Sequence, residues 1–209
     1  MRILFTGDSV TDASRKYDDL YDLGCGYPFY TAELLKAKFP EDNLEFINRG
    51  VSGRRTKDLI ANVEEDVVAI DPDIITVLIG VNDTWRRYDS NDPTSVEDFT
   101  KNYADYLKVC KTKTHAKIII IDAFLIYGMG RDNYREDLDP KLDATRTLAM
   151  KYADHYLPLD GLLAAESLFT APEEISADGV HPAEAGRRII AGYLEPMISD
   201  LIQKIKKGE

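Results

Sequence analysis

The feature that most restricts the fold of this chain is a set of short strands built almost entirely from β-branched residues and leucine. Residues 73–79 read D-I-I-T-V-L-I, and residues 117–121 read K-I-I-I-I. A strand without a polar face has no side to present to water, so such strands are typical of parallel sheets with helices on both faces. Stretches with apolar residues three and four positions apart fill the intervals, as expected for covering helices.

This alternation of strands and helices continues along the chain. We predict strands at residues 3–6, 44–47, 73–79, 117–121 and 156–159. We predict helices at residues 27–39, 56–70, 95–110, 137–152 and 182–207, the last with Pro182 at its first position and a kink at Pro196. The order indicates an α/β fold, a three-layer, doubly wound, flavodoxin-like sheet of about five parallel strands. We expect residues 1–209 to form one domain, because a chain of 209 residues can bury a single core.

Reactive side chains fall on the segments that such a sheet places together. Ligands of doubly wound sheets bind beyond the carboxyl ends of the strands. The segments expected there are residues 7–9, 49–56, 80–87 and 122–130, together with the loop at 176–182 before the last helix. They carry Ser9, Gly53, Asn82, Asp178 and His181.

These residue types fit acyl transfer to a hydroxyl group. A serine hydroxyl is a weak nucleophile that needs a base, and histidine titrates near neutral pH. A carboxylate is needed to orient the histidine, and hydrogen-bond donors are needed to hold the oxyanion. The pattern therefore predicts a serine esterase with Ser9 as nucleophile and with Asp178 and His181 as its acid–base partners.

Four short motifs carry these residues in a fixed order. They are G-D-S at residues 7–9, G-V-S-G at 50–53, G-V-N-D at 80–83 and D-G-V-H at 178–181. Together they resemble the four blocks of the SGNH (GDSL) hydrolase family and span most of the chain. The resemblance implies a sheet of the SGNH-hydrolase type, which agrees with the fold predicted above.

The resemblance also implies a role for each residue. Ser9 is the nucleophile, His181 is the general base and then the general acid, and Asp178 orients His181. The oxyanion hole is formed by the backbone N–H of Ser9, the backbone N–H of Gly53 and the side-chain amide of Asn82.

A narrower resemblance concerns the substrate. The segments G-D-S-V-T-D at 7–12, G-C-G-Y at 24–27 and G-V-N-D-T-W-R-R-Y-D at 80–89 are similar to the intracellular acetylxylan-esterase branch of the family. Those bacterial enzymes remove acetyl groups from xylo-oligosaccharides. The resemblance implies a carbohydrate O-acetylesterase that acts on a small-molecule or oligosaccharide ester through an acetyl-Ser9 intermediate.

Several residues near the predicted site have two interpretations. We predict Asp8, Trp85 and Tyr88 as substrate contacts. Asp8 could instead bond to backbone N–H groups of its own loop, and the two aromatic residues could belong to the core or the rim. Ser52 is a rival nucleophile, although it lies between two glycines. The pattern leaves open the roles of Asp122 and of residues 17–27.

Composition excludes some classes of partner. The net charge is −11 and the pI is about 4.8, so the chain should repel nucleic-acid phosphates and anionic membrane surfaces. No apolar run reaches the roughly 18 residues of a transmembrane helix, and the first apolar stretch is too short for a secretion signal. We therefore expect a cytoplasmic protein.

The spacing of Cys25 and Cys110 suggests no metal site or disulfide framework, and we expect no cofactor. Relatives of the acetylxylan-esterase branch often form homo-oligomers, so self-association stays open.

Three other functions fit parts of the pattern. A general short-chain acyl esterase, lysophospholipase or thioesterase would use the same residues on a different ester. A Mg²⁺-dependent phosphotransfer or receiver domain would use Asp8 as acceptor, but it would leave Asp178 and His181 without a role. A catalytically inactive binding module would not need the complete set of reactive residues.

Overall fold

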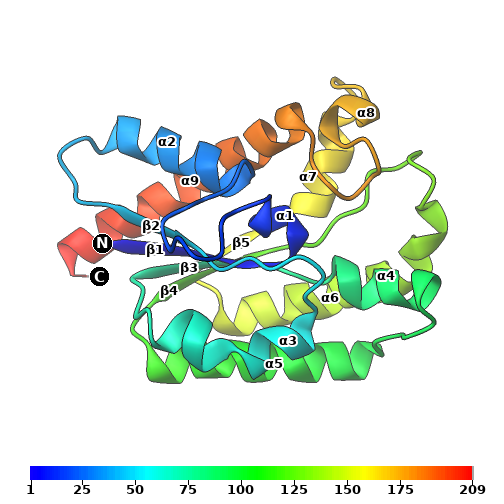
Figure 1. The fold of residues 1–209 in the computed structure, drawn as a ribbon, viewed down its shortest axis with the longest axis horizontal. Coiled ribbons are helices and arrows are strands. Elements are labelled where there is room, and N and C mark those ends of the chain that lie inside the picture. Colours follow the sequence, from blue (N-terminus) through cyan, green and yellow to red (C-terminus); the bar gives the residue numbers. More distant parts are fainter. Residues whose placement is uncertain (209) are drawn as a thin grey trace.

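The computed structural model describes residues 1–208 as a five-stranded sheet with helices on both faces (Figure 1). The strands are β1 (Arg2–Gly7), β2 (Glu45–Asn48), β3 (Ile74–Leu78), β4 (Lys117–Ile121) and β5 (His155–Leu157). Their order across the sheet is β2-β1-β3-β4-β5, and each pairing is parallel. The predicted doubly wound α/β fold is confirmed.

Alternate residues of each strand face opposite layers of helices. Ile3 and Phe5 of β1 belong to the buried cluster that contains residues of α2 (Tyr27–Lys38) and α9 (Glu184–Lys207). Leu4 belongs to a second cluster, on the side of α3 (Thr56–Ala61) and α5 (Val96–Lys113). Figure 1 shows α2 and α9 on one face and α3, α5 and α6 (Arg135–Tyr152) on the other. The strands are apolar because side chains on both faces are covered.

Two predicted boundaries are wrong. Residues 80–87 do not form a loop, because α4 (Val81–Asp89) begins directly after β3. This helix is short and mostly polar, and the helical spacing of Val81, Trp85 and Tyr88 is the signal that the prediction missed. Pro182 is not the first residue of the last helix. It pairs with Ser176 in an isolated bridge, and α9 begins at Glu184 and continues past Pro196.

The remaining differences concern short elements. The helix predicted at 56–70 is divided into α3 and a π-helical turn at Glu64–Val68. Three short helices were not predicted: α1 (Ser9–Asp12), α7 (Leu159–Glu166) and α8 (Pro172–Ile175). No helix within residues 1–208 is long and apolar enough to cross a membrane.

Adjacent strands bring distant parts of the sequence to one edge of the sheet. Gly7 at the end of β1 is in register with Leu78 at the end of β3. The segments that follow these two residues carry Ser9 and Asn82, so both lie beyond the carboxyl ends of neighbouring strands.

Candidate active site

Ser9 is presented at the first turn of a short helix. Gly7 precedes it at a point where a Cβ atom would lie 2.2 Å from Leu78 O and 2.5 Å from the hydroxyl oxygen of Thr11, so no larger residue fits. Asp8 caps α1 by accepting a hydrogen bond from Val10 N at 3.0 Å. This tight turn between β1 and α1 directs Ser9 away from the sheet and toward the pockets described below.

Ser9, His181 and Asp178 form a continuous hydrogen-bonded chain. Ser9 Oγ lies 2.9 Å from His181 Nε2, and His181 Nδ1 lies 2.7 Å from Asp178 Oδ2. An ionised carboxylate can only accept hydrogen bonds, so the proton of a neutral imidazole belongs on Nδ1. Nε2 is then an acceptor and can take the proton of the Ser9 hydroxyl. The three residues are arranged as a nucleophile, a base and an orienting group.

Local hydrogen bonds keep Asp178 in its charged form. Burial by itself raises the pKa of this carboxyl group, but hydrogen bonds from the ring and backbone N–H of His181 and from the backbone N–H of Val180 outweigh it and lower the pKa to about 2. The two backbone bonds go to Oδ1, at 2.8 Å from His181 N and 2.9 Å from Val180 N. Oδ2 therefore remains available for the imidazole ring.

Backbone N–H groups without partners lie beside the serine. Within residues 1–208, the backbone N–H groups of Ser9 and Gly53 have no hydrogen-bond acceptor. Gly53 has φ +85, a conformation that favours glycine. Asn82, on the first turn of α4, uses one amide hydrogen on Arg54 O at 3.2 Å and has a second one to donate. These groups can supply three donors to a negatively charged oxygen.

Two pockets meet at the Ser9–His181 pair, and both have Ser9, Ser52 and His181 in their walls. The first has a volume of about 290 Å³ and is completed by Gly53, Asn82, Trp85, Arg86 and Asp89. The second has a volume of about 250 Å³ and is completed by Val10, Ala13, Ser14, Cys25, Pro182 and Arg187. Of the residues predicted as substrate contacts, Trp85 alone lines either of these two pockets, and its ring centroid lies 6.0 Å from that of His181.

The prediction that Asp8 contacts substrate is wrong. Its side chain is completely buried and caps the N-terminus of α1. Burial raises the pKa of this carboxyl group to about 7. This position confirms the alternative that Asp8 bonds to the backbone of its own loop. It also excludes Asp8 as the acceptor of a phosphoryl group, which would need access from solvent.

Tyr88 and Ser52 are bound to other groups. The ring of Tyr88 stacks on Tyr134 with centroids 3.9 Å apart, and its hydroxyl donates to Asn133 O at 3.1 Å, so it lies outside both pockets. Ser52 Oγ donates to Asp12 Oδ2 at 2.6 Å, whereas His181 Nε2 is bonded to Ser9 Oγ. Tyr88 is therefore not placed as a substrate contact, and Ser52 lacks the base that a nucleophile needs.

Two further carboxyl groups near the sheet edge have structural partners. Asp83 accepts hydrogen bonds from Thr56 N at 3.1 Å and from the Thr56 hydroxyl at 2.8 Å, which joins α3 to α4. Asp122 is buried and accepts from the hydroxyl of Tyr156 at 2.7 and 2.8 Å. Asp122 lines neither pocket around Ser9, so its charge does not shape them.

The sequence reasoning did not identify several residues that line these pockets. Arg86 and Asp89 form an ion pair on α4, which was predicted as a loop up to residue 87. Cys25 and Arg187 join the second pocket from residues 24–26 and from α9. Spacing in the sequence gives no signal for them, because their proximity to Ser9 arises only from the tertiary fold.

Comparison with known proteins identifies the family. Residues 5–189 match the model of the GDSL-like Lipase/Acylhydrolase family. The chain belongs to this family. As a GDSL-like acylhydrolase it is a carboxylic-ester hydrolase, and the resemblance drawn from the four motifs is confirmed.

Two solved relatives of this GDSL-like acylhydrolase share its whole fold. An acetylxylan esterase from Geobacillus stearothermophilus is 32% identical over 197 residues, which cover 91% of this chain and 90% of that protein. Its crystal structure matches with a TM-score of 0.85 at 29% identity, covering 92% of this chain and 91% of the other. An alpha/beta hydrolase enzyme from the metagenome of Lake Arreo, Spain, matches with a TM-score of 0.84 at 27% identity, covering 92% of each chain.

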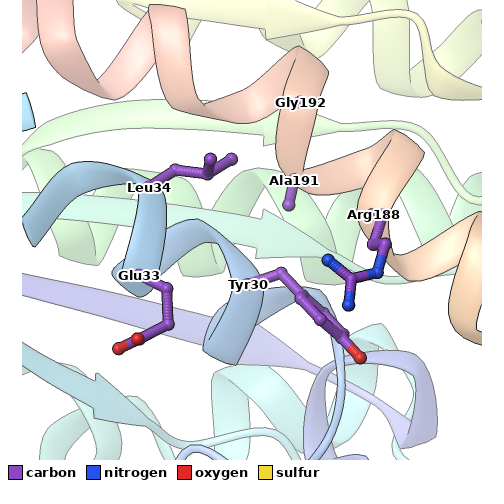
Figure 2. Close-up of a pocket in the computed structure, with 6 residues that line it drawn as sticks. All are labelled: Tyr30, Glu33, Leu34, Arg188, Ala191 and Gly192. Carbon is purple, nitrogen blue, oxygen red and sulfur yellow. The ribbon is translucent and has the colours of Figure 1, made fainter. Parts of the chain in front are cut away.

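A separate apolar pocket of about 410 Å³ lies between α2 and α9 of the GDSL-like acylhydrolase (Figure 2). Its walls are Tyr30, Glu33, Leu34, Arg188, Ala191 and Gly192. It shares no lining residue with the two pockets that contain Ser9 and holds no arrangement of a nucleophile and a base. The candidate catalytic residues therefore lie at the pockets at the edge of the sheet and not in this one.

Proposed function

We propose that this chain is a serine O-acetylesterase that removes acetyl groups from xylo-oligosaccharides or related sugars through an acetyl-Ser9 intermediate. The observation that carries the proposal is the hydrogen-bonded chain from Ser9 through His181 to Asp178. The relatives support it. One solved form of the Geobacillus stearothermophilus protein is described as an acetyl-xylooligosaccharide esterase, and catalytic mutants of that protein replace a serine or a histidine with alanine.

The first half of the cycle forms the acyl-enzyme. Ser9 Oγ attacks the acetyl carbonyl carbon while His181 Nε2 takes the hydroxyl proton. The carbonyl oxygen becomes an oxyanion, which accepts hydrogen bonds from the N–H groups of Ser9 and Gly53 and from the amide of Asn82. The tetrahedral intermediate then collapses, the C–O bond to the sugar breaks, and His181 gives the proton to the departing sugar oxygen.

The second half releases acetate. A water molecule gives a proton to His181 Nε2 and attacks the carbonyl carbon of acetyl-Ser9. The same three donors hold the second oxyanion. The bond to Ser9 Oγ breaks, His181 returns the proton to the serine, and acetic acid leaves as acetate. Asp178 stays ionised throughout, because its pKa of about 2 lies far below the working pH.

Trp85 is the side chain best placed to contact a sugar. It is half-buried and lines the pocket that holds Gly53 and Asn82. Aromatic faces bind the apolar faces of sugar rings while leaving the hydroxyl groups free, since the two surfaces are both flat and apolar. Lipid substrates would instead favour a long apolar cleft, and the pockets around Ser9 are small.

A substrate panel with a matched variant tests the proposal. Initial rates are measured on acetylated xylo-oligosaccharides and on p-nitrophenyl esters of acetate, butyrate and octanoate, with Ser9→Ala as control. We expect acetate to be the best of the simple esters, and we expect Ser9→Ala to be inactive on every substrate. Faster turnover of butyrate or octanoate would favour an acyl esterase or lysophospholipase, and activity in Ser9→Ala would exclude Ser9 as nucleophile. The cytoplasmic location and self-association stay predictions.

A further inference from the structure

The loop that carries Asp178 and His181 has no regular secondary structure between Ser176 and Pro182, which pair in an isolated bridge. Parts of its backbone are buried, but the side chains of Asp178 and His181 are not. The side chain of His181 is 49% exposed and that of Asp178 is 35% exposed. Packing alone therefore does not fix these two side chains, and their alignment with Ser9 depends on contacts that hold the backbone of the loop.

Two arginines hold this loop by its backbone carbonyl groups. Arg131 donates a hydrogen bond to Asp178 O, at one end of the acid–base segment. Arg187 donates from Nε to Pro182 O at 2.8 Å, at the other end. Between them, Gly179 O accepts from the backbone N–H of Ile126 at 2.9 Å. The backbone around Asp178 and His181 is thus fixed on both sides.

The partners of Arg131 and Arg187 differ from those of most arginines in this protein. Within residues 1–208 neither guanidinium group has a carboxylate within 4.0 Å, whereas all the other arginines except Arg15 have one. Carboxylates are abundant in a chain with a net charge of −11. Ordinary surface ion pairing therefore does not account for these two positions.

Arg131 joins the loop to the helix that carries Asn82. Its guanidinium carbon lies 4.3 Å from the ring centroid of Trp85, which is one turn after Asn82 on α4. A guanidinium group attracts the face of an indole ring. Because the guanidinium group is planar, its N–H groups point outward in its own plane and can donate hydrogen bonds while its face lies on the ring. One side chain thus contacts both the indole of Trp85 and the backbone of Asp178.

Arg187 joins the loop to the helix that carries Ser9. Its Nη1 donates to Cys25 O at 3.1 Å, while its Nε holds Pro182 O. The backbone N–H of Cys25 in turn donates to Ala13 O at 2.9 Å, and Ala13 is the C-cap of α1, whose first residue is Ser9. The link from the loop to the nucleophile therefore consists of two backbone segments and one guanidinium group.

We infer that Arg131 and Arg187 are positioning residues that align Asp178 and His181 with Asn82 and Ser9. The inference rests on the proposed function of Ser9. Neither arginine is assigned a proton or a bond to substrate. They act by setting the position of the histidine ring, for which a displacement of about 1 Å can cost about a hundredfold in rate.

The test compares Arg131→Ala and Arg187→Ala with Arg188→Ala. Arg188 is a matched control because it is the next residue on α9, is exposed and pairs with Glu184 on the surface. We expect kcat for p-nitrophenyl acetate to fall about tenfold to a hundredfold in Arg131→Ala and Arg187→Ala, because His181 is no longer aligned with Ser9. KM should stay within about twofold of wild type, because the groups that bind the substrate are unchanged. Arg188→Ala should keep wild-type kcat. Methylguanidine in the buffer should restore part of the kcat of Arg187→Ala.

The outcomes separate this inference from the proposed function. Wild-type kcat in both Arg131→Ala and Arg187→Ala, with Ser9→Ala inactive, would overturn the positioning role and leave the proposed function standing. Activity in Ser9→Ala would overturn the proposed function. If the alanine variants lose the native circular dichroism spectrum, Arg131→Lys and Arg187→Lys carry the test. A lysine keeps the charge but lacks the planar fork of donors by which each arginine spans two partners, so we expect an intermediate kcat, and an unchanged kcat would contradict the inference.

Discussion

Replacing Asp8 with asparagine should stabilise the protein relative to wild type, and this gain in the free energy of unfolding should be larger at alkaline pH than at acid pH. The unfolded chain ionises this carboxyl group near its ordinary pKa of 3.8, whereas burial raises the pKa in the native state to about 7. Between these two values the native state keeps a proton that the unfolded state has released. Wild-type stability therefore falls as pH rises through this window, and the loss is complete above pH 7.

The size of the effect follows from the two pKa values. A difference of about three pKa units corresponds to roughly 4 kcal/mol over the full range, and about 3 kcal/mol of this falls between pH 5 and pH 8. Asparagine removes the charge but keeps a side-chain oxygen that can accept the hydrogen bond from Val10 N. The capping of α1 is thus retained while the titration is lost.

The assay is urea unfolding followed by circular dichroism at pH 5, 6.5 and 8. The free energy of unfolding of Asp8→Asn minus that of wild type should grow by about 3 kcal/mol from pH 5 to pH 8. Asp18→Asn is the matched control, because Asp18 is exposed and the same chemical change there alters no buried group. A difference for Asp8→Asn that stays constant across the three pH values would refute the reasoning.

Other variants test separate parts of the site. Asn82→Ala should lower kcat for p-nitrophenyl acetate by about a hundredfold to a thousandfold, with an unchanged thermal midpoint, because one oxyanion donor is lost; a kcat within threefold of wild type would exclude it as a donor. Trp85→Ala should raise KM for acetylated xylo-oligosaccharides more than KM for p-nitrophenyl acetate, as steady-state kinetics on both substrates would reveal; equal changes would argue against a sugar contact. Asp178→Asn should lower kcat by about four orders of magnitude, because an amide no longer fixes the imidazole tautomer. Stopped assays can measure such residual rates, and near-normal turnover would contradict an orienting role. Asp122→Asn should leave kcat unchanged, since Asp122 lies outside both pockets, and an altered kcat would refute that placement.

The sheet could be predicted because its strands are unusually apolar. All five strands overlap the predicted ranges, and the segments after β1 and β3 meet at one edge as the doubly wound topology requires. Helix α4 does carry a helical period, in Val81, Trp85 and Tyr88, but the segment is so short and polar that the prediction treated it as a loop. That helix forms because it follows Gly80 directly, at φ +130, and because Asp83 is anchored to Thr56.

Some residues of the candidate site could likewise be predicted from the sequence, and others could not. Ser9, Asn82, Asp178 and His181 could be found because their chemistry is carried by side chains in short motifs. For Asp8 the sequence left two roles open, because a cap and a substrate contact look alike in a G-D-S motif, and the structure supports the cap. Contacts such as that of Arg187 with Cys25 O leave no trace in the sequence, since any residue at position 25 would offer the same carbonyl group.

The separation of 172 residues between Ser9 and His181 has a consequence for the time at which activity can arise during synthesis. Ribosomes add roughly 5 to 20 residues per second, so the nucleophile precedes its base by about 10 to 30 s. During that interval the nascent chain carries Ser9 without the histidine that is proposed to act as its base. On the proposed mechanism, esterase activity therefore begins only after His181 has been added and has come to lie beside Ser9.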